Sequence, residues 1–349
     1  MKVMTGIAFE GGGIKGSYEI GAYLAIKDCH IKIKGICGTS IGAFNGAAII
    51  SGNAKPLLDF WLTVEPGKVM GLEPSFINGI VNSKKGPSYI KGLVKSAKTI
   101  IKNRGLDLSL IKNQLDKLID EDMIRNSKLD FGLVTVKRKG LKPILIFKED
   151  IPQGKIKEYV LASCYLPVFK KEKLIDDSTY LDGGFFDNCP VNMLLDKGYK
   201  KIFAIKDNGI GIVKKPKANT AKIINVEPSR HICSIFELNP ENICNNVLMG
   251  YFDTIRIIKK YDGEKFVIKP KSSRYFKRIC RKIDAKAMNR VKAFFHTKTM
   301  KETVIKALEY AMELNEENYY QILSYHQVIK KAKKYQRQHF VIEFIKNLK

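Results

Sequence analysis

The first 50 residues repeat one pattern twice: a buried strand, a turn that contains glycine, and a helix. Val3–Phe9 predicts a strand that leads through a glycine loop into a helix at about residues 17–27. Ile31–Thr39 predicts a second strand, and a helical pattern begins just after Ser40. A strand–helix–strand–helix beginning is typical of a parallel sheet covered by helices. We therefore expect an α/β fold.

Further strand patterns and one long helical segment follow this beginning. Residues 66–128 are mainly helical and polar, with glycines, and we interpret them as an insertion over the sheet that forms a lid or an acyl groove. The later strand patterns are Phe131–Val136, Pro143–Phe147, a short one that ends at Leu181–Asp182, Lys201–Ile205 and Ile223–Val226.

The last third of the chain is mostly helical in pattern. Val304, Leu308 and Met312 follow one another at intervals of four and mark one apolar helix face. We assign residues 1–208 to a core domain, and residues 209–349 to a remaining strand and a mainly helical C-terminal region.

Neither the cysteines nor the apolar segments predict export or membrane insertion. The seven cysteines are scattered and include no Cys-x-x-Cys pair, which favours free thiols over disulfides or a zinc site. Lys2 precedes only the short apolar stretch Val3–Phe9, which is shorter than a secretory segment. The longest uncharged run, Gly35–Ala54, is interrupted by glycine, serine and asparagine, unlike a membrane span. We expect a cytoplasmic protein.

The net charge of +26 is the extreme feature of the composition. A basic surface attracts polyanions such as nucleic acid or anionic lipid headgroups, although plentiful lysine also fits an ordinary solvated surface. Residues 259–349 carry 23 Lys/Arg against 9 Asp/Glu, and Lys330–Arg337 lies on an amphipathic stretch. This pattern favours peripheral contact with an anionic membrane surface. No nucleic-acid-binding motif accompanies the charge, so no nucleic acid is expected as a partner.

A glycine-rich loop, Gly11-Gly12-Gly13-Ile14-Lys15-Gly16, joins the first strand to its helix. Glycines let the backbone approach a bound group closely, and free N–H groups at a helix start stabilise negative charge. Dinucleotide-binding loops share this spacing, but they need an acidic residue at the end of the second strand, and residues 31–41 contain none. A phosphate-binding P-loop is disfavoured because Ser17, not lysine, follows Gly16.

The segment Gly38-Thr39-Ser40-Ile41-Gly42 joins the second strand to a helix. In this context G-x-S-x-G is typical of a nucleophile elbow, a turn so sharp that the serine hydroxyl points out above the sheet. The N–H of Ile41 can then donate to a tetrahedral oxyanion. A Ser–acid–His triad is disfavoured because His231, the candidate nearest the strand patterns, lies in a loop-like stretch, and because Ser40 already follows the second strand.

Asp182-Gly183-Gly184 is by itself a turn signal, and it gains meaning from the other two motifs. In this order the three motifs resemble those of the patatin-like phospholipases, most clearly over residues 3–206 and more faintly over residues 240–263. Two flanking segments share the resemblance: Ala162–Phe169 and Asn188–Val191. One departure is the charged run Lys170–Lys173, where apolar residues and prolines are usual.

The resemblance implies a three-layer α/β/α fold with a mainly parallel central sheet, and a Ser–Asp dyad without histidine, metal or cofactor. Ser40 would be the nucleophile and Asp182 its base, with a pKa raised by burial from its usual value of about 4. The amides of the Gly11–Gly13 loop would form the oxyanion hole together with Ile41. The remaining motif residues, expected to shape these loops, are Lys15, Gly16, Gly38, Gly42, Gly183 and Gly184.

The activity implied is that of a lipid acyl hydrolase acting on a glycerophospholipid or lysophospholipid. Two alternatives remain at this point. One is a non-lipid esterase or thioesterase that uses the same dyad. The other is an inactive protein whose basic C-terminal half binds a partner or nucleic acid, although the presence of both Ser40 and Asp182 disfavours it.

Overall fold

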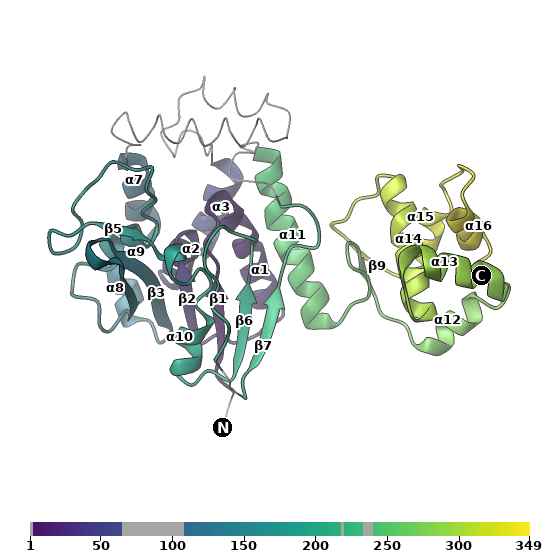
Figure 1. Ribbon diagram of the computed structural model, residues 1–349, viewed down its shortest axis with the longest axis horizontal. Coiled ribbons are helices and arrows are strands. Elements are labelled where there is room, and N and C mark those ends of the chain that lie inside the picture. The colour runs from purple at the N-terminus through teal and green to yellow at the C-terminus, as the bar shows by residue number, and fades with distance from the viewer. Residues whose placement is uncertain (1–2, 65–107, 218–219, 233–239) are drawn as a thin grey trace, which may run out of the picture. The chain divides into compact units, whose positions relative to one another are not determined.

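The structure, a computed structural model, describes residues 3–64, 108–217, 220–232 and 240–349 (Figure 1). The chain folds into two compact units, unit 1 (residues 1–251) and unit 2 (residues 252–349). Most of the predicted insertion, residues 66–107, lies outside the described residues.

The sheet of unit 1 has the strand order β4-β3-β2-β1-β6-β7, and β5 pairs with β3 beside this path (Figure 1). Its strands are β1 (Thr5–Phe9), β2 (Gly35–Thr39), β3 (Asp130–Lys137), β4 (Lys142–Phe147), β5 (Tyr180–Asp182), β6 (Lys201–Ile205) and β7 (Lys222–Val226). Neighbouring strands in the series β3-β2-β1-β6-β7 are parallel to one another. Strands β4 and β5 are both antiparallel to β3. The sheet is therefore mainly parallel, as the sequence predicted.

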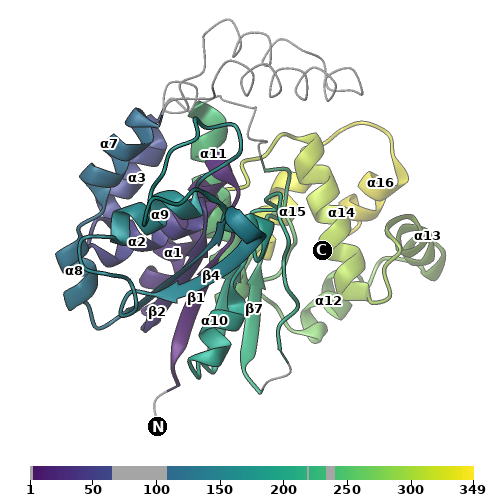
Figure 2. The ribbon, with the colours of Figure 1, turned by 60° about the vertical axis from the view of Figure 1, so that its left-hand side comes forward.

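Helices cover both faces of this sheet. The helices of unit 1 are η1 (Gly13–Gly16), α1 (Ser17–Asp28), α2 (Ile41–Ile50), α3 (Ala54–Thr63), α7 (Ser109–Leu118), α8 (Glu121–Asn126), η2 (Lys139–Leu141), α9 (Ile156–Ser163), η3 (Gly183–Phe185), α10 (Val191–Asp196) and the first part of α11 (Pro240–Lys259). Helix α2 packs on β2 and β3, α9 packs on β3 and β5, and α10 packs on β1, β2 and β6. Figure 2 shows the sheet between α2 and α10, so unit 1 has three layers.

The first two strands begin later than predicted. The first two start at Thr5 and Gly35, not at Val3 and Ile31, because Lys32 is exposed and the alternating Ile-Lys segment lies before the buried part of the strand. All five residues of each strand are buried. Burial on both faces is the normal environment of a central parallel strand.

Helix α11 contacts α1 backbone to backbone within unit 1. A Cβ atom on Gly21 would lie 1.9 Å from the carbonyl oxygen of Val247, and one on Gly250 would lie 2.0 Å from that of Tyr18. Side chains at either glycine would force the two helices apart. The glycines therefore place α11 beside the helix that follows the glycine-rich loop.

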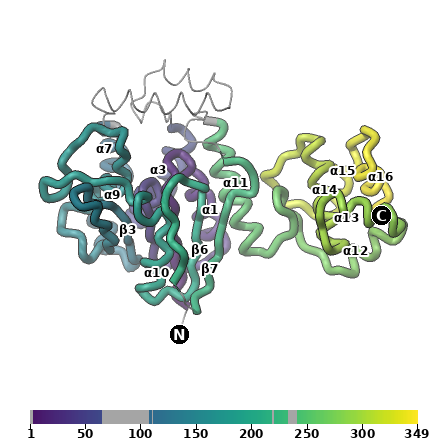
Figure 3. Tube along the Cα trace, in the orientation of Figure 1, coloured from purple at the N-terminus to yellow at the C-terminus, as the bar shows by residue number. Residues whose placement is uncertain are grey.

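Unit 2 is helical apart from one short parallel strand pair, β8 (Val267–Ile268) with β9 (Ile322–Leu323). Figure 3 shows the path of the chain through its helices. Its helices are α12 (Ser273–Ile279), α13 (Ala285–Phe295), α14 (Met300–Leu314), α15 (Tyr325–Ala332) and α16 (Phe340–Lys346). Val304, Leu308 and Met312 lie in its hydrophobic core, which confirms the predicted helix face. Among the described residues, no helix is long and apolar enough to cross a membrane.

Candidate active site

The register of β3 brings Ser40 and Asp182 together. Strand β2 ends at Thr39, which pairs with Val134 of β3. Strand β5 ends at Asp182, which pairs with Thr135, the next residue of β3. Two segments about 140 residues apart in sequence therefore meet at one point of one strand. The Ser40 side chain is close enough to the Asp182 carboxyl there to lower its pKa.

Ser40 occupies a strained turn between β2 and α2. Its φ is 55° and its ψ is −127°, a backbone conformation that side-chain-bearing residues rarely adopt. The turn is so tight that a Cβ atom on Gly38 would lie 2.3 Å from the backbone of Gly42. Glycine is needed at both positions for Ser40 to stand at the N-terminus of α2, as in a nucleophile elbow.

Ser163, at the end of α9, holds this turn in place. The backbone N–H of Ser40 donates to Ser163 Oγ at 2.8 Å, and this hydroxyl donates to the carbonyl oxygen of Val134 at 2.6 Å. Thr39 is also fixed, since its hydroxyl donates to the carbonyl oxygen of Asp187 at 2.7 Å. Ser163 belongs to the Ala162–Phe169 segment, but the sequence did not predict that its hydroxyl would bind the backbone of Ser40.

Asp182 is buried, and its two oxygens have different surroundings. Oδ1 accepts the N–H of Gly184 at 2.8 Å. Oδ2 has no hydrogen-bond partner of ordinary geometry among the described residues. Burial raises the pKa of Asp182 to about 6, against smaller opposing effects of Ser40 and Gly184. The carboxyl is thus ionised at neutral pH and has one oxygen able to accept a proton.

The neighbouring glycine, Gly183, allows this arrangement. A Cβ atom there would lie 2.1 Å from the carbonyl oxygen of Val134, so any larger residue would push Asp182 away from β3. A Cβ atom on Gly184 would lie 2.7 Å from Asn188 Oδ1. Both glycines of the D-G-G motif are therefore needed because neighbouring atoms leave no room for a side chain, and not only because the chain turns there.

The glycine-rich loop corrects one prediction. The N–H of Gly11 donates to the carbonyl oxygen of Asn188 at 3.0 Å, so it is not available to an oxyanion. Gly11 supplies room instead, because a Cβ atom there would lie 2.9 Å from the Cβ of Ser40. The N–H groups of Gly12, Gly13 and Ile41 have no acceptor among the described residues, and Gly13 and Ile41 line the cavity described below.

Three buried carboxyl groups lie beneath this loop and were missed by the sequence reasoning: Glu10, Glu19 and Asp207. Burial raises the pKa of each of them, and mutual repulsion adds to the effect at Glu19 and Asp207. Lys15 donates to the carbonyl oxygen of Asn208 and lowers the pKa of Asp207. This hydrogen bond connects the glycine-rich loop to the segment that follows β6.

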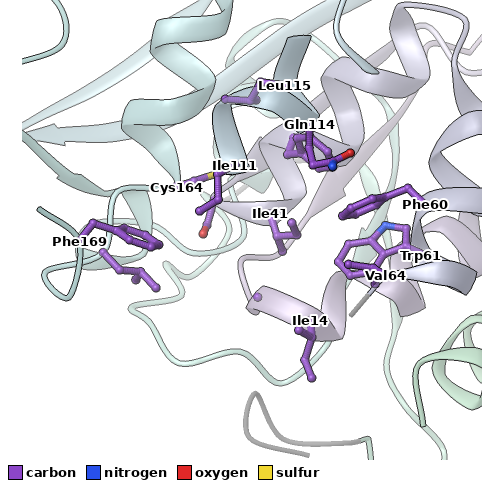
Figure 4. A pocket seen from close by; sticks show the side chains of 14 residues that line it. Ile14, Ile41, Phe60, Trp61, Val64, Ile111, Gln114, Leu115, Cys164 and Phe169 are labelled. Carbon is purple, nitrogen blue, oxygen red and sulfur yellow. The ribbon is translucent and has the colours of Figure 1, made fainter. Parts of the chain in front are cut away.

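An apolar cavity of about 140 Å³ opens beside Ser40. Figure 4 shows Trp61 and Phe60 of α3 on one side of Ile41, and Phe169 on the other. The remaining lining residues are Gly13, Ile14, Phe44, Val64, Ile111, Gln114, Leu115, Cys164 and Leu166. No histidine is among the described residues that line it. The cavity suits an apolar chain whose reacting end lies at Ser40.

Cys164 lines the cavity next to both Ser40 and Asp182. Burial raises the pKa of its thiol well above the ordinary value, and the Asp182 charge raises it further. The thiol is therefore protonated at neutral pH and is a poor nucleophile. Ser40 remains the candidate nucleophile of this site.

No curated protein matches the sequence closely enough to count as a relative. Among solved structures, VipD from Legionella pneumophila is 12% identical, with a TM-score of 0.45 over 96% of this chain and 80% of that one. The type III effector ExoU is 12% identical, with a TM-score of 0.37 over 99% and 71%. ExoU from Pseudomonas aeruginosa in complex with SpcU is 14% identical, with a TM-score of 0.32 over 98% and 76%.

The family comparison is more specific. Residues 7–195 match the model of the patatin-like phospholipase family. The matched region is more than half of the chain, and it includes the glycine-rich loop, the elbow and the D-G-G turn. This chain belongs to the patatin-like phospholipase family.

Proposed function

We propose that this enzyme hydrolyses carboxylic-ester bonds of phospholipids or lysophospholipids through a Ser40–Asp182 dyad. Family membership makes the chain a hydrolase of the phospholipase type. The proposal for the dyad is carried by one observation: the register of β3 places Ser40 beside a buried carboxyl that has an unpartnered oxygen, and Ser40 lines an apolar cavity.

In the first step, Ser40 Oγ attacks the acyl carbonyl carbon and its proton passes to Asp182 Oδ2. The N–H groups of Gly12, Gly13 and Ile41 are the donors available to the oxyanion, and each such donor contributes about 3 kcal/mol in related sites. The alcohol then leaves with the proton from Asp182, and the acyl group stays on Ser40.

In the second step, a water molecule gives a proton to Asp182 and attacks the acyl-enzyme. The fatty acid is released and the proton returns to Ser40 Oγ. The same carboxyl serves both steps, which is supported by the absence of histidine from the described cavity lining and by a pKa of about 6 for Asp182.

The lining favours a long acyl chain over a short polar ester. Aromatic and branched side chains surround the cavity, and Gln114 is the one side chain with an amide among its described residues. A non-lipid esterase or thioesterase with the same dyad would instead prefer short soluble substrates. A comparison of long-chain phospholipids with short dissolved esters separates the two activities.

The nucleophile is tested by labelling with a fluorophosphonate, which reacts with activated serines. Wild-type protein is expected to be labelled and Ser40→Ala to lose the label completely, whereas Ser178→Ala keeps it, because Ser178 lies outside the site. Asp182→Asn is expected to lower the labelling rate by at least a hundredfold. Retention of the label in Ser40→Ala would reject the proposal.

Unit 2 is proposed to contact anionic membrane lipid. It carries 24 Lys/Arg against 10 Asp/Glu, an excess that attracts a negatively charged surface. Sedimentation with neutral and phosphatidylglycerol-containing vesicles tests this contact. Stronger binding to the anionic vesicles supports it, and equal binding to both rejects it.

A further inference from the structure

The segment between β6 and β7 exposes apolar side chains beside the candidate active site. Ile210 is 90% exposed, Ile212 56% and Val213 44%. Phe185, which follows the D-G-G motif, is 51% exposed. These four residues are called the apolar loop surface below. Large aliphatic and aromatic side chains exposed together on neighbouring segments are typical of a contact surface.

The backbone of this loop is held in place, so the exposure does not result from a loose segment. The N–H of Ile212 donates to the carbonyl oxygen of Gly184 at 2.9 Å, and its carbonyl oxygen accepts the N–H of Asn188 at 2.6 Å. Further along, the N–H of Lys217 donates to Asn192 Oδ1 at 2.8 Å, and Asn192 Nδ2 donates to the carbonyl oxygen of Lys215 at 3.0 Å. The side chains are presented on a fixed framework.

The same loop borders the catalytic loops. The N–H of Asp207 donates to the Glu10 carboxyl at 2.8 Å, just before the glycine-rich loop. A Cβ atom on Gly209 would lie 1.8 Å from the carbonyl oxygen of Gly11, so the two backbones touch. Ile212 is hydrogen-bonded to Gly184, and Gly184 follows Asp182 by two positions in the sequence. Any surface that covers the apolar loop surface therefore lies beside Ser40.

The charges next to the apolar loop surface are positive. Lys214, Lys215 and Lys217 follow it directly, and the segment from 208 to 217 contains no acidic residue. Three of the acidic side chains that contact this segment are buried: Glu10 accepts the N–H of Gly209, the Asp207 carboxyl lies close to the same N–H, and Asp187 Oδ1 accepts the N–H of Lys214. Another, Asp196, pairs with Lys217. Apolar tips followed by lysines are the pattern of interfacial membrane contact, because lysine places its stem in the apolar layer and its ammonium at the headgroups.

We propose that the apolar loop surface inserts into the outer layer of an anionic phospholipid bilayer and holds the active site against it. This proposal rests on the function proposed above, and it names where that enzyme meets its substrate. A lipid surface is favoured over a protein partner because the exposed apolar side chains are followed directly by Lys214, Lys215 and Lys217, whose charge matches phosphatidylglycerol or phosphatidylserine headgroups.

The proposal is tested by vesicle sedimentation in the Ser40→Ala background, so that the lipid is not hydrolysed and binding is measured apart from catalysis. The test variant is Ile210→Asp with Ile212→Asp. The matched control is Leu141→Asp with Leu145→Asp, which adds the same charge at two exposed apolar residues near the β3–β4 hairpin. Unfolding temperatures of both variants show that they fold.

With vesicles of phosphatidylcholine and phosphatidylglycerol, the loop variant is expected to bind at least tenfold more weakly than the parent, and the control to bind like the parent. Equal binding by the loop variant and the control would overturn the proposal. Loss of binding in both would show that added charge alone is responsible, which also overturns it.

A second measurement detects insertion directly and does not depend on a loss of vesicle binding. Trp61 is the single tryptophan of the chain, so Ile210→Trp in a Trp61→Phe background places one fluorophore on the loop. Its emission is expected to shift to shorter wavelength on addition of anionic vesicles. An unchanged spectrum at saturating lipid would contradict insertion. Fluorophosphonate labelling tests the hydrolase separately, so the two proposals can fail independently.

Discussion

In the proposed mechanism Asp182 must be ionised to accept a proton from Ser40, and burial raises its pKa to about 6. We predict that kcat/KM rises with pH, reaches half of its maximum near pH 6 and is flat above pH 7. A pH profile on a soluble ester measures this. Asp187 is the control, because burial also raises its pKa to about 6 but it faces Lys214 instead of Ser40. Asp187→Asn should keep the inflection; its loss there would contradict the assignment.

The same raised pKa has a consequence for stability. The unfolded chain ionises Asp182 at a lower pH than the folded protein does, so stability falls as pH rises from about 4 to 6. Asp182→Asn is therefore expected to raise stability at pH 8 by on the order of 2 kcal/mol, and to change it little at pH 4. Urea unfolding at the two pH values measures the difference. An equal effect at both would show that ionisation is not the cause.

Ser163 holds the Ser40 turn without contacting the substrate position. We predict that Ser163→Ala lowers kcat tenfold or more with little change in KM, because the Ser40 N–H loses its acceptor. Ser51→Ala is the matched control, since Ser51 is also buried and hydrogen-bonded but lies away from the cavity. Both changes should cost about 1–3 kcal/mol in unfolding free energy. Only the first should slow hydrolysis.

At the scale of elements, α3 forms one wall of the cavity. The indole N–H of Trp61 donates to Asn45 Oδ1 at 3.0 Å, and Asn45 Nδ2 donates to Glu19 at 2.7 Å, so this wall is fixed. Trp61→Ala is predicted to shift kcat/KM toward longer acyl chains by about tenfold, as expected for added apolar pocket volume. Leu62→Ala, on the same helix but outside the lining, serves as the control in a chain-length series.

At the scale of the whole molecule, each unit has its own hydrophobic core. Leu308 is fully buried in unit 2, so Leu308→Ala is predicted to destabilise this unit by about 2–5 kcal/mol. Calorimetry should show a lowered transition, while fluorophosphonate labelling of Ser40 persists above it. Loss of labelling together with that transition would show that the two units unfold as one.

Much of unit 1 could be predicted from the sequence because its signals are local. Buried runs such as Lys201–Ile205 match their strands closely, and the glycines around Ser40 indicate a sharp turn whatever the rest of the chain does. The helix face of Val304, Leu308 and Met312 follows from spacing alone. Strand ends were less predictable, because the exposure of Lys32 depends on where the neighbouring strands end.

The finer features of the site depend on contacts between distant segments. The engaged N–H of Gly11 could not be foreseen, because its acceptor Asn188 is 177 residues away. Ser163 is 123 residues from the N–H that it holds. Nothing in the sequence around Glu10 or Asp207 indicates that their carboxyl groups are buried, because the fold brings the two residues together.

The sequence by itself determined the order of strands and helices, the sharp turn at Ser40 and the family to which the chain belongs, since these follow from periodicity, glycine placement and motif order. Only the tertiary structure decided that the N–H of Gly11 is engaged, that Glu10 and Asp207 are buried together, and that Ile210 and Ile212 stand exposed. The reason is that burial, dielectric environment and exposure are properties of packed neighbours, which the covalent order of residues does not contain.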